Sequence, residues 1–155
     1  MPVPVTIRLQ ENDFDVTAEI AALTRGRTDI GAVVNFIGIC RGDDDGHTVN
    51  ALTLEHYPGM AEAEIGRHAA EALERWPLMG LTIVHRHGRI APGENIVLVV
   101  TASSHREAAF QAAEFLMDYL KTNAPFWKRE ESAQGTAWVE ARHADDAAAA
   151  RWTKS

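Results

Sequence analysis

The spacing of apolar and polar residues predicts six strands. Alternation of apolar with polar residues, or a run of β-branched and aromatic residues, is typical of strands. The stretch 94–102 is apolar almost throughout, as expected of a central strand that is covered on both faces. The six predicted strands are 3–9, 31–40, 49–57, 80–88, 94–102 and 135–141.

Three helices are predicted between these strands. The clearest spans 105–121, where apolar residues recur every three or four positions. Another runs from 58 to 76, and a short one begins at Asp15 or Thr17 and ends at Leu23. Because strands and helices do not alternate strictly, we expect an α+β fold with a mixed, mainly antiparallel sheet packed against helices.

Length and composition predict a single domain over residues 1–155. The segment 42–48, rich in Gly and Asp, is expected to be a mobile loop, and 144–155 a C-terminal tail with a helical turn. Fifteen Lys and Arg against 22 Asp and Glu give a net charge of −7, which argues against nucleic acid as a partner. No run approaches about 18 apolar residues, so no membrane span is expected. The first residues lack the pattern of a secretory signal, so we expect a cytoplasmic protein.

Two features of the 105–121 helix suggest binding chemistry. Ser104 and Glu107 have the spacing of a capping box, which would place His105 and Arg106 in the first turn. Cations are unfavourable there unless an anion binds, and helix N-termini suit phosphate. The alternative is a solvated Arg106 beside a His105 packed on the sheet.

The chain contains twelve Arg but only three Lys, and two of these, Lys121 and Lys128, lie seven residues apart. Unlike Arg, a desolvated Lys can lose its proton. Phe126 and Trp127 between them could lower a lysine pKa or simply anchor the core. A helix from Arg106 to Lys121 is about 22 Å long, so its two ends cannot touch one small ligand in one chain.

Other reactive side chains have competing interpretations. Cys40 is either a nucleophile or, as we expect, a small buried hydrophobic residue, and a single cysteine excludes an internal disulfide. Arg41 alone suggests a surface cation paired with the acidic residues 43–45. His85 and His87 form at most half of a metal site, and we expect no metal.

Several motifs resemble the large, catalytic subunit of molybdopterin synthase, and the similarity runs in the family's order from about residue 30 to 152. The longest matches surround LEHYPGM and the two lysines. The motifs are GAVVNFIGICR, NALTLEHYPGM, RWPL, HRHGRIAPGE, SSHREAAF, MDYLKTNAPFWKRE and WVEAR.

This resemblance implies an α/β-hammerhead fold and a sulfurtransferase. Its homodimer would bind two small ubiquitin-like sulfur-carrier subunits, forming a heterotetramer. The carrier's C-terminal thiocarboxylate would supply sulfur to cyclic pyranopterin monophosphate (precursor Z), giving the dithiolene of molybdopterin. It implies no cofactor and no metal. The implied catalytic residues are Lys121 and Lys128, and the implied substrate-binding residues are Ile39, Cys40, Arg41, His105, Arg106, Lys121, Lys128, Arg129 and Glu130.

Within this interpretation we expect Lys121 to be the closer catalytic group, Lys128 to position the carrier tail and the substrate, and Arg41 to act from the neighbouring protomer. Two other functions stay open from the residues alone. One is a non-catalytic partner of a ubiquitin-like protein. The other is a stand-alone enzyme acting on phosphate esters, with His105 as general acid.

Overall fold

A computed structural model describes residues 2–44, 46–122, 126–133, 135–139 and 150–153. The first sheet has the order β1-β6-β8-β2, in which β1 and β6 are parallel and the other pairs antiparallel. Its strands are β1 (Val5–Gln10), β2 (Ala32–Ile39), β6 (Leu78–Arg86) and β8 (Asn95–Ser103).

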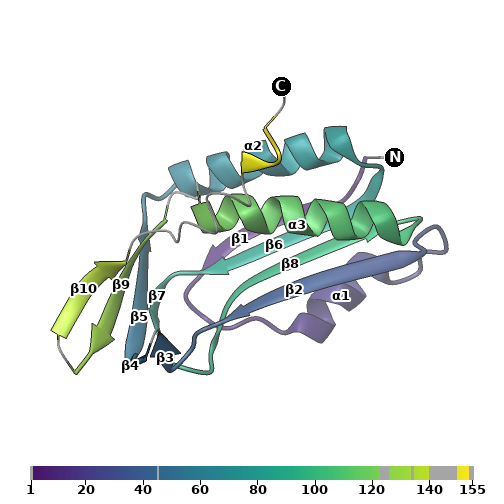
Figure 1. The fold of residues 1–155 in the computed structure, drawn as a ribbon. Helices are drawn as coiled ribbons and strands as arrows, with labels where there is room; N and C mark the ends of the chain where they lie inside the picture. The colour runs from purple at the N-terminus through teal and green to yellow at the C-terminus, as the bar shows by residue number, and fades with distance from the viewer. Residues whose placement is uncertain (1, 45, 123–125, 134, 140–149, 154–155) are drawn as a thin grey trace.

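A second sheet, antiparallel throughout, lies across one end of the first (Figure 1). Its order is β10-β9-β5-β7, and a short antiparallel hairpin, β3 with β4, lies nearby. The bounds are β3 (Asp43–Asp44), β4 (His47–Thr48), β5 (Ala51–His56), β7 (Gly88–Ile90), β9 (Phe126–Ser132) and β10 (Gly135–Val139).

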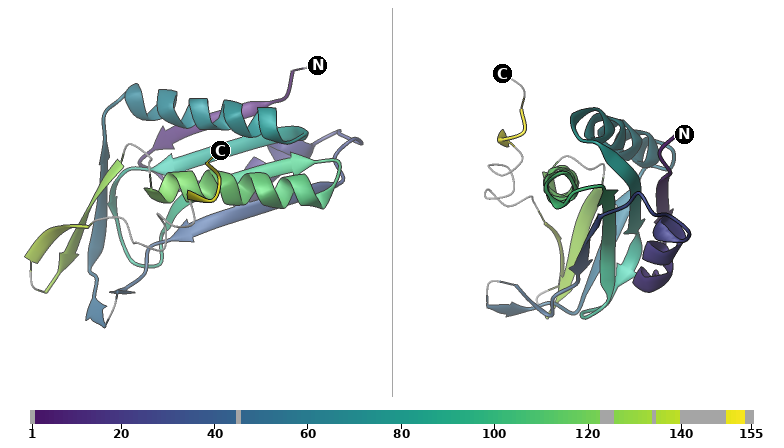
Figure 2. Two further views of the ribbon diagram at one scale, coloured as in Figure 1. Left: turned by 45° about the horizontal axis from the view of Figure 1, so that its top comes forward. Right: turned by 90° about the vertical axis from the view of Figure 1, so that its right-hand side faces the viewer.

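Helices cover both faces of the first sheet. Helices α2 (Met60–Arg75) and α3 (Arg106–Thr122) lie on one face, and α1 (Val16–Thr24) lies on the other (Figures 1 and 2). Successive side chains of β8 point to opposite faces of the sheet, and both faces are buried. Val99 packs in the core under α2 and α3, while Val100 packs in the core with Phe14 and Leu23. This double coverage explains why the strand is almost entirely apolar.

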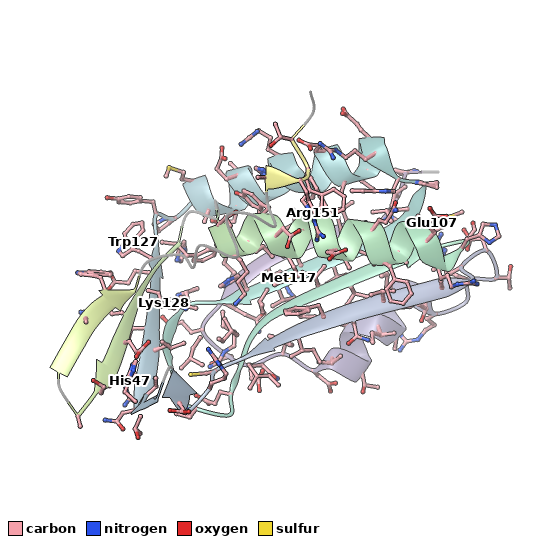
Figure 3. The ribbon with its side chains drawn as sticks, viewed as in Figure 1. His47, Glu107, Met117, Trp127, Lys128 and Arg151 are labelled. Atoms are coloured by element: carbon pink, nitrogen blue, oxygen red, sulfur yellow. The ribbon has the colours of Figure 1, made fainter. Side chains whose placement is uncertain are left out.

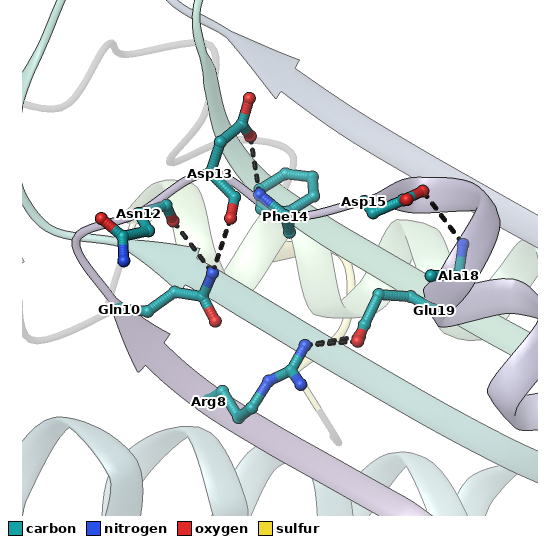
Figure 4. Close-up of polar contacts among 8 residues, drawn as sticks. All are labelled: Arg8, Gln10, Asn12, Asp13, Phe14, Asp15, Ala18 and Glu19. Carbon is teal, nitrogen blue, oxygen red and sulfur yellow. Dashed lines mark hydrogen bonds and ion pairs between the residues drawn. The ribbon is translucent and has the colours of Figure 1, made fainter.

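Local polar contacts fix the connection from β1 to α1 (Figure 4). The Asp15 carboxylate accepts a hydrogen bond from the Ala18 N–H at 3.1 Å, so Asp15 is the N-cap of α1. Gln10 donates to the carbonyl oxygens of Asn12 and Asp13 at 2.9 and 3.0 Å, which closes the turn before the helix.

The predicted α+β class with a mixed, mainly antiparallel sheet is confirmed, and each of the six predicted strands overlaps an observed one. Three details were wrong. The long helix begins at Arg106, so His105 precedes it. The segment 42–48 contains the hairpin strands β3 and β4, and the strands β7 and β9 were not predicted.

The C-terminal tail is described only at residues 150–153, while 140–149 and the end of the predicted strand 135–141 lie outside the described residues. Trp152 packs against the core beneath α2 and α3, and its indole N–H donates to Asp118 of α3. Over the described ranges, none of the helices has the length and apolarity needed to cross a membrane.

Candidate active site

The two predicted lysines lie where α3 ends and β9 begins. Lys121 is in the last turn of α3 and is exposed, and Lys128 is a half-buried residue of β9 that pairs with Leu54 of β5. Phe126, at the start of β9, stacks on His85 of β6 with ring centroids 4.0 Å apart. This stack forms a flat aromatic surface near the lysines.

His85 is held in its neutral form. Its Nδ1 lies 2.8 Å from the Arg86 carbonyl oxygen, and because a carbonyl can only accept, Nδ1 carries the proton. Burial, helped by the nearby Lys121 ammonium, lowers the pKa of His85 to about 4. The imidazole therefore supplies a rigid, uncharged surface at neutral pH.

Strand alternation on β9 separates the predicted pocket residues. Lys128 and Glu130 share a face with Phe126, which packs against the core, and Glu130 is buried. Arg129 is on the opposite face, where its guanidinium lies 3.0 Å from Glu55 Oε1 and 5.5 Å from the Trp138 ring centroid. Arg129 is therefore separated from Lys128.

The end of β2 contributes Ile39, Cys40 and Arg41. Ile39 and Arg41 are exposed, whereas Cys40 is only 2% exposed. Burial raises the pKa of the Cys40 thiol, and Lys128 is the nearby cation that partly offsets this effect. A buried thiol with a raised pKa is a poor nucleophile, which supports the interpretation of Cys40 as a packing residue. Because Lys128 acts electrostatically on Cys40, the residue before Arg41, the backbone of Arg41 lies at the same end of the molecule as Lys128.

His105 and Arg106 lie at the other end of α3, and both are exposed. In Figure 3, the neighbouring Glu107 and Lys128 are labelled at opposite ends of the helix. The seventeen residues of α3 span about 25 Å. One chain therefore does not bring His105 and Arg106 together with the two lysines.

His85 and His87, considered above as half of a metal site, are not joined by further metal ligands among the described residues. His85 already uses Nδ1 in a backbone hydrogen bond, and His87 packs beside His56 with ring centroids 4.6 Å apart. Among the described residues, no group of three or more His, Cys, Asp or Glu side chains could hold a metal ion.

Two residues of this region were missed by sequence reasoning. His47 contacts Glu130 across 83 positions of sequence, and Glu55 binds both Arg129 and Trp127. The alternation of the predicted strand 49–57 could have placed Glu55 on a polar face. His47, in contrast, lies in a segment whose sequence indicates only a loop.

The fold and these side chains define an α+β protein with two lysines, Lys121 and Lys128, at the junction of α3 and β9. This region, the cationic end, is suited to an anionic group. The chain belongs to the MoaE protein family, which it matches over residues 9–123. It is 66% identical over 152 residues to the molybdopterin synthase catalytic subunit of Mesorhizobium japonicum, covering 97% of this chain and 94% of that protein.

Solved structures show the same similarity. The molybdopterin biosynthesis MoaE protein of Burkholderia ambifaria is 51% identical, with a TM-score of 0.82, covering 97% of this chain and 99% of that one. The molybdopterin synthase of Staphylococcus aureus is 30% identical, with a TM-score of 0.77, covering 84% and 94%. The family expected from the sequence motifs is therefore confirmed.

Proposed function

We propose that this chain is the catalytic subunit of a molybdopterin synthase, acting as a sulfurtransferase. It takes sulfur from the C-terminal thiocarboxylate of a small ubiquitin-like carrier subunit and transfers it to cyclic pyranopterin monophosphate. In each transfer the carrier's C–S bond breaks and its carbonyl carbon gains an oxygen from the substrate or water, which leaves the carrier with a carboxylate and the substrate with one sulfur of the dithiolene. The observation that carries this proposal is the similarity to molybdopterin synthase catalytic subunits over 97% of the chain.

The electrostatics of the cationic end support this chemistry. A thiocarboxylate and a cyclic phosphate are both anions, and ammonium groups stabilise negative charge that develops during attack. Lys128, in strand β9 of the second sheet, lies near Cys40 at the end of β2, so it is suited to hold the carrier tail. Lys121 lies in the last turn of α3 near the neutral His85, so it is suited to act as acid, base or oxyanion stabiliser.

The remaining pocket residues support a homodimer. His105 and Arg106 are about one helix length from the lysines of their own chain, so we infer that they complete the pocket of a second protomer. The edge strand β2 exposes Phe36 (39%) and Ile39 (54%), and an apolar edge of this kind favours association. The backbone of Arg41 lies at the same end of the molecule as Lys128 of its own chain. This favours Arg41 contributing to the pocket of its own chain, rather than to that of the neighbouring protomer as expected from the family.

The test is reconstitution with thiocarboxylated carrier and cyclic pyranopterin monophosphate, followed by detection of molybdopterin. Lys121→Ala should lower turnover by about 100-fold, as removal of a charge-stabilising group does. Arg67→Ala removes an exposed cation on α2 that pairs with Glu64, far from both lysines in sequence, and serves as the matched control. Full turnover by Lys121→Ala would remove Lys121 from the mechanism.

The same assay separates the other two functions. Product formed without carrier would favour a stand-alone enzyme with His105 as general acid. Carrier binding without any product would favour a non-catalytic partner. Product that requires the thiocarboxylated carrier is the result expected of a synthase.

A further inference from the structure

The hairpin that follows Arg41 is joined to β9 by one polar contact. His47 Nε2 of β4 lies 2.5 Å from Glu130 Oε1 of β9. The His47 side chain is 46% exposed, while the Glu130 side chain is only 10% exposed. A carboxylate at such a depth requires a hydrogen-bond donor, because an unpaired buried charge is costly. In either protonation state, His47 supplies that donor through Nε2–H.

Glu130 is also a neighbour of Lys128. The two residues are two positions apart on the same face of β9, so their Cβ atoms are separated by about 7 Å along the strand. A Lys side chain with four methylene groups can cross this distance and pair with the carboxylate. Within the described part of the chain, however, Lys128 forms no ion pair, and the carboxylate of Glu130 pairs with His47.

One further carboxylate lies near this region. The charges of Lys128, Glu94 and Glu130 all act on the Cys40 thiol, so each of these groups lies near Cys40. Glu94 Oε1 accepts a hydrogen bond from the Ala91 N–H at 2.6 Å, which engages this carboxylate in the turn before β8. Glu130 is thus the acidic group best placed to compete for Lys128.

We propose that His47 is a positioning residue of the sulfur-transfer site. By occupying the Glu130 carboxylate, it leaves the Lys128 ammonium available for the anionic tail of the carrier. It also anchors the β3–β4 hairpin against β9, with the backbone bond from Val49 N to Gly42 O (3.0 Å) closing the hairpin base next to Arg41. This inference rests on the proposed function, since it concerns how Lys128 meets the carrier.

The experiment compares His47→Ala and His47→Gln in the reconstituted synthase, with carrier and pyranopterin varied separately. His47→Ala should raise KM for the thiocarboxylated carrier by about tenfold, because Lys128 then pairs with Glu130 and the carrier tail loses a cation. KM for the pyranopterin, for which His105 and Arg106 are also implied binding residues, should rise less. His47→Gln, whose amide can still donate to Glu130, should restore most of the carrier affinity. Arg89→Gln breaks the exposed pair with Glu131 on the other face of β9 and is the matched control, expected to match the wild type.

A double substitution separates positioning from a purely structural effect. In a Glu130→Gln background no carboxylate remains to capture Lys128, so adding His47→Ala should cause no further rise in the carrier KM. An unchanged carrier KM in His47→Ala would overturn the inference, as would an equal rise in both backgrounds. A wild-type chain that makes no molybdopterin with carrier would instead overturn the proposed function, and this inference with it.

Discussion

The buried His85 predicts a specific loss of stability in acid. Its imidazole is neutral in the folded protein, where burial lowers its pKa to about 4 from the ordinary value of 6.5. Between these two pH values the unfolded chain binds a proton at this side chain and the folded chain does not, so the free energy of unfolding falls as the pH is lowered through the window. With 1.36 kcal/mol for each tenfold change in proton affinity, the loss is about 3 kcal/mol by pH 4.

The assay is urea unfolding of the wild type and of His85→Asn at several pH values between 7 and 4. Asn keeps a donor for the Arg86 carbonyl but has no group that titrates here, so its destabilisation relative to the wild type should be largest at pH 7. The difference should shrink by about 3 kcal/mol by pH 4. Asp29 and Glu64, whose carboxyl pKa values are lowered by hydrogen bonds from Arg27 and Arg67, also weaken the fold in acid, but they do so equally in both proteins.

His105→Asn is the matched control, because it makes the same substitution at an exposed histidine. If the His85→Asn and wild-type stabilities fell in parallel from pH 7 to pH 4, His85 would have to be protonated in the fold, and the reasoning from its burial would be refuted.

Three further changes test the packing. Gly31→Ala should destabilise the fold by about 2 kcal/mol or more in urea unfolding, because a Cβ there would lie 2.1 Å from the Ser104 carbonyl oxygen. Cys40 should resist a thiol reagent in the native protein and react in urea, because it is buried and its thiol pKa is raised. Trp152→Ala should cost about 2 kcal/mol, since it loses packing against the core beneath α2 and α3.

Each of these has a built-in comparison. Gly66→Ala places a methyl group in α2 with its nearest atom 3.8 Å away, so it should be neutral or stabilising, and a loss equal to that of Gly31→Ala would contradict the steric argument. Rapid labelling of Cys40 without denaturant would show an accessible thiol. Trp152→Phe should retain part of the ring packing, and equal losses for Ala and Phe would assign the effect to the Asp118 hydrogen bond instead.

The core elements could be predicted because their apolar periodicity reflects what covers them. The unbroken apolar run of β8 and the stripe on α3 correspond to a strand between two layers and a helix on one of them. Strand β9 escaped prediction because its inner face carries Phe126, Lys128 and Glu130. Two charged residues on an inward face do not produce the alternation that identifies a half-buried strand.

The candidate site could be predicted only in part for a related reason. The rarity of Lys made Lys121 and Lys128 conspicuous, and the family motifs gave them a role. To predict that Arg129 and Lys128 lie on opposite faces, one would need to know that both belong to a strand, and β9 was not predicted. The contact between His47 and Glu130 depends on how the hairpin meets the second sheet, which no local pattern specifies.

The length of α3 allows the assembly of the pocket to be tested by mixing chains. We consider a dimer of one Lys121→Ala chain and one Arg106→Ala chain. If each pocket takes Lys121 from one protomer and Arg106 from the other, one pocket carries both defects and its partner carries neither, so activity returns in the mixed dimer. If each pocket is built from one chain, every pocket carries a defect and activity stays low. Because about 22 Å of rigid helix separates the two residues, we expect activity to return, and verified mixed dimers that remain inactive would contradict a shared pocket.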